Sequence, residues 1–378
     1  MKLTILGIRG IPAAHGGFET FAECLALYLV SKGWQVVVYC QENGKGPIRE
    51  DDWRGVKRAI VPVSREGAMG TIEFDWRCIS HLVRQTDPGL VLTLGYNTAL
   101  FCVRLRAAGI LNIINMDGLE WKRDKWRYHE RAWLWLNERC GCWFGNHLVA
   151  DHPEIANHLA TRVDRQKITM IPYGGTEVLD ADLTKLASVG VSADSFVTVI
   201  ARPEPENSIR EIVRAFSRKR RGIYLIMLGR YEPEKNSFHK AVLDVASPEV
   251  IFPGAIYDQS VVQALRYFGR AYLHGHRVGG TNPSLVEALG AGSAVIAHDN
   301  PFNRWVAGDT AAFFRDEDTC AALLDRLLGD DNILKQMRKS SLERFRMRFT
   351  WSQVFSEYEN LFAEMAKRKR IYPSNNCG

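Results

Sequence analysis

The chain lacks the cysteine and histidine patterns that would mark a disulfide scaffold or a zinc site. None of its eight cysteines forms a CxxC pair, and no His/Cys cluster has zinc-ligand spacing. Such scattered cysteines are typical of reduced thiols in a cytoplasmic protein. Long apolar runs are also missing. The longest uncharged stretch, Pro88–Val103, is shorter than the roughly 20 residues that span a bilayer, and the run in residues 1–11 is too short for a secretory signal.

Internal repeats, low-complexity tracts and a strong charge bias are absent too. Hydrophobic residues make up 46% of the 378 residues and charged residues 24%, which excludes intrinsic disorder and fibrous proteins. The net charge of +6 suits an anionic ligand or an anionic membrane surface, but it is too small to indicate nucleic-acid binding.

Continuous apolar runs alternate with amphipathic helical patterns through most of the chain. Such runs predict parallel strands covered by helices on both faces. The predicted strands are 3–8, 35–40, 90–94, 111–116, 147–150, 168–172, 196–201, 223–228, 250–252, 271–274 and 294–298, and from Asp316 onward the pattern is helical.

The alternation pauses at residues 171–176, where Pro and paired Gly indicate a linker. We therefore expect two doubly wound, Rossmann-like α/β domains, residues 1–173 and 174–349, followed by a C-terminal helical segment, residues 350–378. Doubly wound sheets bind ligands at the carboxyl ends of their strands. The candidate site residues should lie in strand-to-helix loops, and the site in a cleft between two facing domains.

The first such loop is rich in glycine and runs from Gly7 to Gly17 into a helix. Glycines let a ligand approach the backbone, and a helix N-terminus offers N–H groups to an anion. Arg9, Gly16 and Gly17 are thus candidates for binding a diphosphate. Glu19 is a candidate ligand contact or an acidic residue that favours the helix start.

A second loop, residues 117–126, places polar and aromatic residues directly after a buried strand. Asp117 or Glu120 could meet a sugar hydroxyl or a developing positive charge, with Trp121 beside them. The alternative is that Asp117 caps the next helix.

A third loop follows the first strand of the second domain, where Arg202 could bind a phosphate at a helix start. The alternative is a surface ion pair with Glu204 or Glu206.

The fourth loop runs from His274 to Glu287, with a helix predicted to begin near Pro283. Glu287 could bind both hydroxyls of a ribose, or form an ion pair on the helix face. The residues expected to face a phosphate or sugar are His276, Gly279, Gly280, Thr281 and Asn282. His274 and His276 lack a third ligand, so packing under the loop is favoured over metal binding. Asp180 and Asp182 form a DxD pattern that lies outside any strand-end loop.

Together these segments resemble the family-4 retaining glycosyltransferases of GT-B architecture, and more closely their rhamnosyltransferase-type branch. The motifs that carry the resemblance are Gly-Ile-Arg-Gly-Ile-Pro with Gly-Gly-Phe-Glu-Thr-Phe, Met-Asp-Gly-Leu-Glu-Trp-Lys-Arg, Ala-Arg-Pro-Glu-Pro-Glu-Asn, and His-Gly-His with Gly-Gly-Thr-Asn-Pro-Ser-Leu-Val-Glu. The resemblance covers nearly the whole chain. It implies a last helix, from Trp351 onward, that crosses back onto the first domain.

The resemblance implies Asp117, Arg202 and Glu287 as catalytic-site residues, Asn207 as a donor contact, and Glu19, Glu120 and Trp121 as acceptor-side residues. It also implies that no metal is needed. Three positions depart from the family pattern: Gly279 replaces a glutamate, Asn207 a lysine and Asp117 a histidine. The second cation on the leaving diphosphate is therefore open, with Arg9 and Arg277 as candidates.

The implied activity is retaining hexosyl transfer, best matched by L-rhamnose from dTDP-L-rhamnose, onto a lipid-linked or growing surface polysaccharide. Transfer of another hexose from a UDP- or GDP-sugar, a GT-B-type sugar-nucleotide epimerase and a non-catalytic sugar-nucleotide-binding protein remain alternatives.

Basic residues and tryptophans cluster around residues 121–144. A helix there would place Trp133, Leu136 and Cys140 on one face. Basic residues flanking an aromatic face suit an anionic membrane interface, and packing on the sheet is the alternative. We expect a cytoplasmic protein that lies peripherally on the inner face of the cell membrane.

Overall fold

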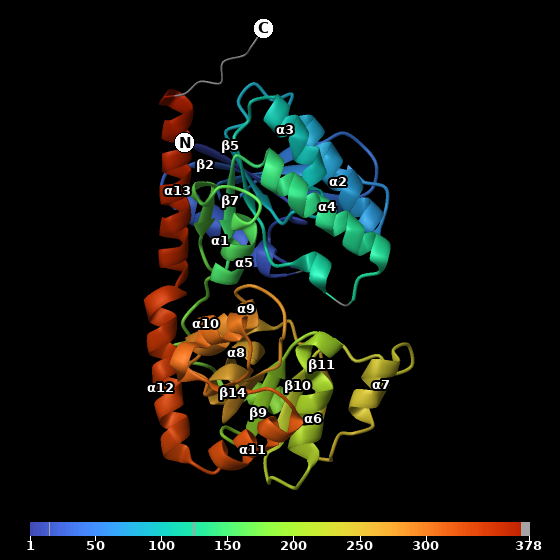
Figure 1. The fold of residues 1–378 in the computed structure, drawn as a ribbon, viewed down its shortest axis with the longest axis vertical. Helices are drawn as coiled ribbons and strands as arrows, with labels where there is room; N and C mark the ends of the chain where they lie inside the picture. Colours follow the sequence, from blue (N-terminus) through green and yellow to red (C-terminus); the bar gives the residue numbers. More distant parts are fainter. Residues whose placement is uncertain (15, 124, 372–378) are drawn as a thin grey trace. The chain divides into compact units, whose positions relative to one another are not determined.

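The computed structural model describes residues 1–14, 16–123 and 125–371, so His15 and Asp124 of the predicted loops lie outside the described residues. The chain forms two compact units. Unit 1 comprises Met1–Lys122, Trp126–Pro172 and the segment from Trp351 onward, and unit 2 comprises Arg123–Lys125 and Tyr173–Thr350. Each unit is built on one mostly parallel sheet (Figure 1).

Unit 1 holds an eight-stranded sheet in the order β3-β4-β2-β1-β5-β6-β7-β8, parallel except for β3. Its strands are β1 (Lys2–Leu6), β2 (Gln35–Asn43), β3 (Arg49–Trp53), β4 (Val56–Val63), β5 (Leu90–Leu94), β6 (Asn112–Asn115), β7 (His147–Ala150) and β8 (Ile168–Met170). Its α-helices are α1 (Gly17–Ser31), α2 (Gly67–Leu82), α3 (Val103–Ala107), α4 (Tyr128–Phe144), α5 (Pro153–Ala160) and α13 (Trp351–Ile371), with short 3-10 helices at Ala99–Cys102, Glu120–Lys122 and Arg165–Lys167.

The strand order of unit 1 reverses between β1 and β5, because the chain builds outward from β1 to β2 and then returns to β5. Helices α2, α3 and α4 lie together, and α13 packs on α1 (Figure 1). Aromatic rings make that last contact: Phe21 lies 5.0 Å from Tyr358, and Trp34 lies 6.0 Å from Phe362, measured between ring centroids.

Unit 2 holds a six-stranded parallel sheet in the order β11-β10-β9-β12-β13-β14. Its strands are β9 (Phe196–Ile200), β10 (Tyr224–Leu228), β11 (Val250–Gly254), β12 (Ala271–His274), β13 (Val295–His298) and β14 (Ala312–Phe314). Its α-helices are α6 (Ile209–Ser217), α7 (Ser237–Leu243), α8 (Gln259–Phe268), α9 (Pro283–Gly290), α10 (Pro301–Ala307), α11 (Glu317–Leu327) and α12 (Asp331–Arg348), with 3-10 helices at Leu183–Val189, Pro205–Asn207 and Gly308–Thr310.

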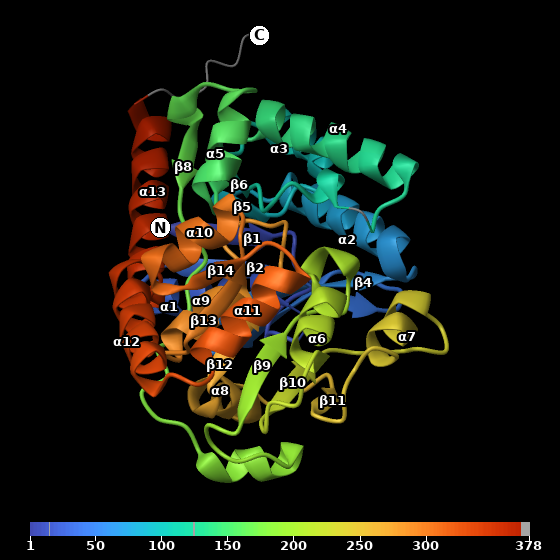
Figure 2. The ribbon, with the colours of Figure 1, turned by 60° about the horizontal axis from the view of Figure 1, so that its bottom comes forward.

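Apolar cores pack against this second sheet, and Figure 2 shows helices such as α6 and α11 lying alongside its strands. Helices α6 and α11 pack together over one core, and α9, α10 and α12 form another group of neighbours. Here the strand order reverses between β9 and β12. The carboxyl ends of these two strands therefore define the edge where a doubly wound sheet binds its ligand.

The predicted strands are confirmed to within a few residues, but three strands were missed. Strands β3 and β4 form a hairpin that the sequence analysis left out, and β14 is a third strand at the sheet edge. β3 is almost wholly exposed and reads Arg-Glu-Asp-Asp-Trp, so it has no apolar run. The sequence feature that could have indicated the hairpin is Gly55, because a two-residue turn needs positive φ at both positions and favours glycine there. In the structure both Arg54 and Gly55 have positive φ.

Candidate functional site

The loops after β9 and β12 bring Arg202 and His276 together in unit 2. β9 ends at Ile200 and β12 at His274, and these strands are neighbours at the point where the strand order reverses. Burial, together with the nearby positive charges of Arg123 and Arg202, lowers the pKa of His276 to about 3. His276 is therefore a neutral ring beside two guanidinium groups at neutral pH.

Arg202 is exposed, and hydrogen bonds to its backbone carbonyl hold the turn on which it lies. The Arg202 carbonyl accepts hydrogen bonds from the side-chain amide of Asn207, at 2.8 Å, and from the backbone N–H of Glu204, at 2.7 Å. Asn207 is buried and holds the turn, so this geometry gives it a positioning role for Arg202. Next to it, Ser208 has a left-handed backbone with φ of 50° and forms the N-cap of α6.

The ion pair that the sequence suggested for Arg202 is instead made by Arg123. The Arg123 guanidinium binds Glu206 with an Nε–Oε1 distance of 2.8 Å, and both side chains are largely buried. Arg123 lies in the first half of the sequence but groups with unit 2. Arg277, one of the two candidates for a second cation, donates to Glu211 and to the Ser208 hydroxyl, both at 2.9 Å.

Histidine side chains pack against the loop after β12, and asparagine side chains hydrogen-bond to its backbone. His274 is fully buried, and its ring stacks on that of His276 at a centroid distance of 4.4 Å, so packing under the loop is confirmed for His274. Burial also keeps the pKa of His274 well below its usual value. The His276 carbonyl accepts from the side-chain amides of Asn300, at 3.0 Å, and Asn303, at 2.8 Å.

The rest of this loop leads into α9 as the sequence predicted. Pro283 is the first helical residue, and the Asn282 side chain caps the helix by accepting from the Ser284 N–H at 3.0 Å. Gly279 and Gly280 are partly buried, and Thr281 is buried. Gly279 has φ of 147°, a backbone conformation that suits glycine.

Glu287 lies about one turn inside α9 and forms an ion pair, but its partner comes from another helix. Arg266 of α8, which is buried, places Nη2 at 2.6 Å from Oε2 of Glu287. The Glu287 side chain is 35% exposed, so the pair orients a carboxylate that solvent can reach. Because the guanidinium is buried, it needs the carboxylate to balance its charge.

In unit 1, the glycine-rich loop after β1 is shaped by close backbone contacts. A Cβ on Gly7 would lie 2.2 Å from the carbonyl oxygen of Leu94, so only glycine fits there. Arg9 and Gly16 are exposed, and Gly17 is partly buried at the start of α1. Glu19 lies buried in the first turn of α1.

The loop after β6 places Asp117 in a strained conformation. Its φ is 48°, which is uncommon for a residue other than glycine and is tolerated best by Asp and Asn. Its N–H donates to the side-chain oxygen of Asn115 at 2.9 Å, and the Asn115 side-chain amide donates to the Tyr358 hydroxyl of α13 at 2.8 Å. Strain of this kind is concentrated at functional sites, where the surrounding structure must hold it.

Glu120 and Trp121 are tied into the same loop. The Trp121 indole donates to buried Glu138 of α4 at 2.6 Å, and the Glu120 carboxylate accepts from the Trp126 indole at 3.3 Å. Burial alone would raise the pKa of Glu138, but hydrogen bonds from His158 and Trp121 and the charge of Arg162 hold it below its usual value. Glu120 and Trp121, two of the three predicted acceptor-side residues, therefore help to fix the loop that carries Asp117.

One site residue was missed by the sequence analysis. Asp75 of α2 lines a crevice of about 50 Å³ between the carboxyl ends of β1 and β5, together with Gly7, Gly95 and Thr98. The Thr98 hydroxyl donates to Asp75 at 2.7 Å, and burial raises the pKa of this carboxyl to about 6. The available signal was an acidic residue on the buried face of α2, which otherwise holds Phe74, Cys78, Ile79 and Leu82.

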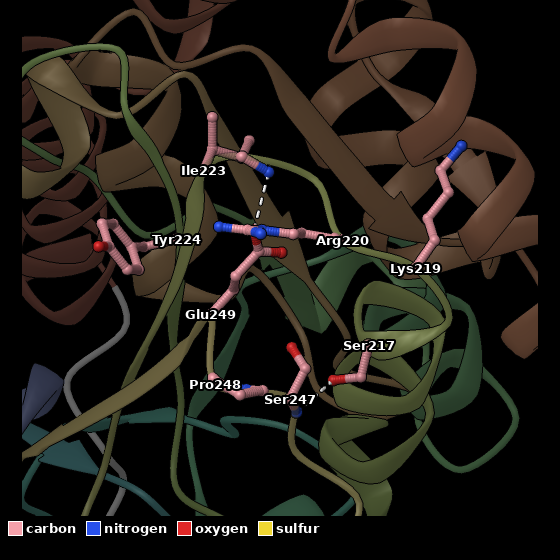
Figure 3. A pocket seen from close by; sticks show the side chains of 9 residues that line it. Ser217, Lys219, Arg220, Ile223, Tyr224, Ser247, Pro248 and Glu249 are labelled. Atoms are coloured by element: carbon pink, nitrogen blue, oxygen red, sulfur yellow. Dashed lines mark hydrogen bonds and ion pairs between the residues drawn. The ribbon is translucent and has the colours of Figure 1, made fainter.

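A second pocket, of about 600 Å³, lies at the amino ends of strands β10 and β11 in unit 2 (Figure 3). Tyr224 at the start of β10 and Glu249 just before β11 line it, with Ser217 and Ser247. Because it lies at the amino ends of the strands, it is separate from the Arg202 edge. Within the described ranges, no group of three or more His, Cys, Asp or Glu residues could hold a metal ion. Asp182 of the DxD pattern caps the 3-10 helix at Leu183–Val189.

The face predicted for membrane contact on α4 is only partly exposed. Leu136 is 38% exposed, but Cys140 is buried, and the Trp133 indole donates to the Asn97 carbonyl at 2.9 Å. The face that α4 does expose carries Tyr128, Trp135, Leu136 and Trp143, and the Arg139 guanidinium lies over the Trp135 ring at 4.6 Å from its centroid. Among the helices the structure describes, none has the length and apolar content to span a membrane.

Comparison with known proteins supports the fold assignment. Residues 1–177 match the profile of a family described as a domain of unknown function (DUF1972). No curated protein matches the chain.

The chain is similar over nearly its full length to solved glycosyltransferase structures. Sucrose-phosphate synthase from Thermosynechococcus elongatus is 16% identical, with a TM-score of 0.82 over 97% of this chain and 99% of that one. The Anabaena protein HepE, solved with UDP and glucose, is 12% identical, with a TM-score of 0.74 over 96% of this chain and 99% of that one. A glycosyltransferase from Rickettsia africae is 12% identical, with a TM-score of 0.68 over 97% of this chain and 98% of that one. The protein therefore has the GT-B fold, with two Rossmann-like domains.

Proposed function

We propose that the protein is a glycosyltransferase that moves a sugar from a nucleoside-diphosphate donor to a growing glycan. The observation that carries this proposal is the meeting of Arg202 and His276 at the β9/β12 edge of a GT-B unit, beside α9 with Glu287. A guanidinium binds phosphate well, and a carboxylate can accept from the sugar hydroxyls of the nucleoside, both of them in UDP or GDP and the 3′-hydroxyl alone in dTDP.

The proposed roles follow the charge that develops during transfer. The bond between the sugar C1 and the diphosphate oxygen breaks, and its electron pair goes to that oxygen, where Arg202 stabilises it. C1 forms its new bond to the acceptor oxygen on the same face, and the acceptor proton goes to the departing phosphate. Asp117 has the charge to stabilise the positive character of the sugar. The arginines supply the positive charge in this scheme, so we propose that the reaction needs no metal.

The proposed donor is dTDP-L-rhamnose, with UDP- or GDP-hexoses as the alternatives, and the proposed acceptor is a lipid-linked or surface-polysaccharide glycan. These finer assignments rest on the motif resemblance. A 6-deoxy sugar needs an apolar pocket where a hexose has a hydroxymethyl group, so discrimination should be modest, about 100-fold at most.

The test is a donor screen against polyprenyl-diphosphate-linked acceptors that records product mass and anomeric configuration. We expect rhamnosyl product with the donor's anomeric configuration retained. Efficient transfer from UDP-glucose with none from dTDP-rhamnose would change the donor. Product formed from donor alone would indicate an epimerase, and binding without turnover would indicate a binding protein.

We further propose that α4 rests on an anionic membrane surface through its exposed aromatic face. Tyr128, which is 91% exposed, and Trp143, which is 57% exposed, lie on this face with Trp135 and Arg139. Aromatic side chains prefer the headgroup region, and neighbouring arginines are attracted to anionic lipid.

Vesicle co-sedimentation tests this surface. The wild type should bind vesicles containing phosphatidylglycerol more tightly at low salt, because ions screen the arginine contribution. The double variant Trp135→Ser/Trp143→Ser should bind several-fold more weakly. Tyr257→Ser, at an 80% exposed aromatic residue of unit 2, is the matched control. Equal sedimentation of all three proteins would rule out membrane contact by α4.

A further inference from the structure

A nucleoside diphosphate leaves with several negative charges, yet Arg202 is one cation. In the glycosyltransferases that the motifs resemble, a lysine supplies a second cation, but this chain has Asn207 at that position. Asn207 is buried, and its side-chain amide donates to the Arg202 carbonyl. Arg277 donates to Glu211 and Ser208 of α6, and its side chain is 43% exposed. Arg9 is exposed as well, so neither guanidinium is held as firmly as a buried one would be.

Arg123 lies close to the same loop as Arg202. It is part of unit 2 through the short segment Arg123–Lys125, and its charge, like that of Arg202, acts on the His276 ring. Two arginines from separate parts of the sequence thus lie beside one residue of the loop after β12. That loop leads into the N-terminus of α9, where anions are favoured.

The Glu206 ion pair fixes the position of the Arg123 guanidinium. Only 16% of the Arg123 side chain and 6% of the Glu206 side chain are exposed, and both Nε and Nη2 of Arg123 bind the same carboxylate oxygen, Oε1. A guanidinium carries five N–H donors in a rigid plane, so it can bind a carboxylate and a phosphate oxygen together. Glu206 is held in turn, because its backbone carbonyl accepts from the Arg277 N–H at 3.0 Å.

We propose that Arg123 is the second cation of the donor site and binds the terminal phosphate of the nucleoside diphosphate together with Arg202. This inference rests on the proposed function and adds a residue to its donor site. During transfer, the electron pair of the broken C1–O bond moves onto that phosphate, and Arg123 shares the charge with Arg202.

Calorimetric titration with dTDP and dTMP tests the proposal on the full-length protein. The wild type should bind dTDP about tenfold more tightly than dTMP, since a charged hydrogen bond to phosphate contributes about that factor. Arg123→Met should remove most of this preference while leaving dTMP affinity within about threefold. Arg123→Lys keeps the charge without the planar fork and should fall between the two.

Two controls separate binding from folding. Arg220→Met removes an arginine that is 94% exposed at the opposite edge of the sheet, and it should keep the wild-type preference. Arg123→Met leaves buried Glu206 without its partner, so Arg123→Met/Glu206→Gln removes both charges and should show the same loss as the single variant.

The outcomes distinguish this inference from the function on which it rests. A wild type that prefers dTDP, with the same preference in both Arg123→Met variants, overturns the role of Arg123 and leaves the glycosyltransferase proposal standing. An equal loss of dTDP and dTMP affinity also overturns it, because the terminal phosphate is then not the group that Arg123 binds. A wild type that binds no nucleoside diphosphate, with UDP and GDP tested as well, overturns both proposals.

Discussion

At the scale of single residues, Glu287 shows how a structural ion pair changes the design of an experiment. Its carboxylate is held at 2.6 Å by Arg266, a buried cation. Replacing Glu287 with alanine would leave that cation without a partner, and the resulting loss of stability would obscure any loss of donor binding.

We therefore predict the effect of Glu287→Gln, which keeps the shape and a hydrogen-bond acceptor. If Glu287 binds the sugar hydroxyls of the nucleoside, affinity for UDP, which has both, should fall about 10- to 100-fold, the cost of removing a charged hydrogen-bond partner, and affinity for dTDP, which has only the 3′-hydroxyl, should fall less. Affinity for the 2′,3′-dideoxy analogue of UDP should not change, because that ligand lacks the hydroxyls. A folded variant with wild-type affinity for UDP and dTDP would return Glu287 to a purely structural role.

Asp75 gives a pH-dependent prediction. Its pKa is about 6 in the folded protein and about 4 in an unfolded chain, so the folded state binds the proton more tightly. The stabilisation is complete below about pH 4 and is lost as the pH rises through 6. Cys78 and Cys102 nearby stay neutral over this range, because burial raises the pKa of both thiols.

Asp75→Asn should therefore gain stability relative to the wild type as the pH rises from 5 to 8, by roughly 1.4 kcal/mol. Urea unfolding of both proteins across that range measures the difference. A constant difference between the two proteins would mean that Asp75 does not titrate there.

The same residue marks a limit of sequence reasoning. Arg202 and Asp117 lie in strand-end loops, and Glu287 lies one turn into the helix that follows such a loop, so all three could be found from the alternation of strands and helices, although their roles stay predictions. Asp75 lies inside a helix, and its position becomes informative only when α2 is placed against β1 and β5. Arg123 likewise needs the fold, because its partner Glu206 is 83 residues away in the sequence.

At the scale of elements, α13 does more than cover α1. Its Tyr358 hydroxyl accepts from Asn115, and Asn115 accepts from the Asp117 N–H, so the last helix supports the strained residue of the β6 loop. The other side of α13 is fixed separately, by Glu359 accepting from the Tyr28 hydroxyl at 2.9 Å.

We predict that Tyr358→Phe lowers turnover about three- to tenfold, as expected when one hydrogen bond of about 1 kcal/mol no longer orients Asn115. Donor affinity should stay unchanged, because no donor contact is altered. Tyr28→Phe is the matched control: it removes a hydroxyl bond to the same helix without touching Asn115. Asp117→Asn keeps a residue that tolerates positive φ and should lose more turnover than Tyr358→Phe. Equal turnover in Tyr358→Phe and Tyr28→Phe would separate α13 from catalysis.

The strands that the sequence analysis missed show what periodicity cannot predict about secondary structure. Periodicity found most of the strands that are buried on both faces, because those are continuous apolar runs, but it missed β4, whose buried residues 59–63 follow the polar pair Lys57 and Arg58. β3 is exposed, antiparallel and charged, and β14 has three residues, so neither produces such a run. Their places depend on pairing with β4 and β13, which is tertiary information.

At the scale of the whole molecule, the boundary between units does not coincide with one cut in the sequence. Unit 1 takes its last helix from the far end of the chain, and unit 2 takes Arg123–Lys125 from the first half. The expected domain boundary near residue 173 describes one of the several crossings between the units.

This interleaving limits how such proteins can be recombined. A chimera joined near residue 173, with its first half from a relative, would pair a foreign α1 with the native α13, whose ring contacts with Phe21, Tyr28 and Trp34 are specific in shape. It would also import a foreign residue to face Glu206. Exchange of donor specificity between relatives therefore requires at least two crossovers, one before the segment 123–125 and one before Trp351. A single-crossover library should be depleted of folded, active members unless both parents share these contacts.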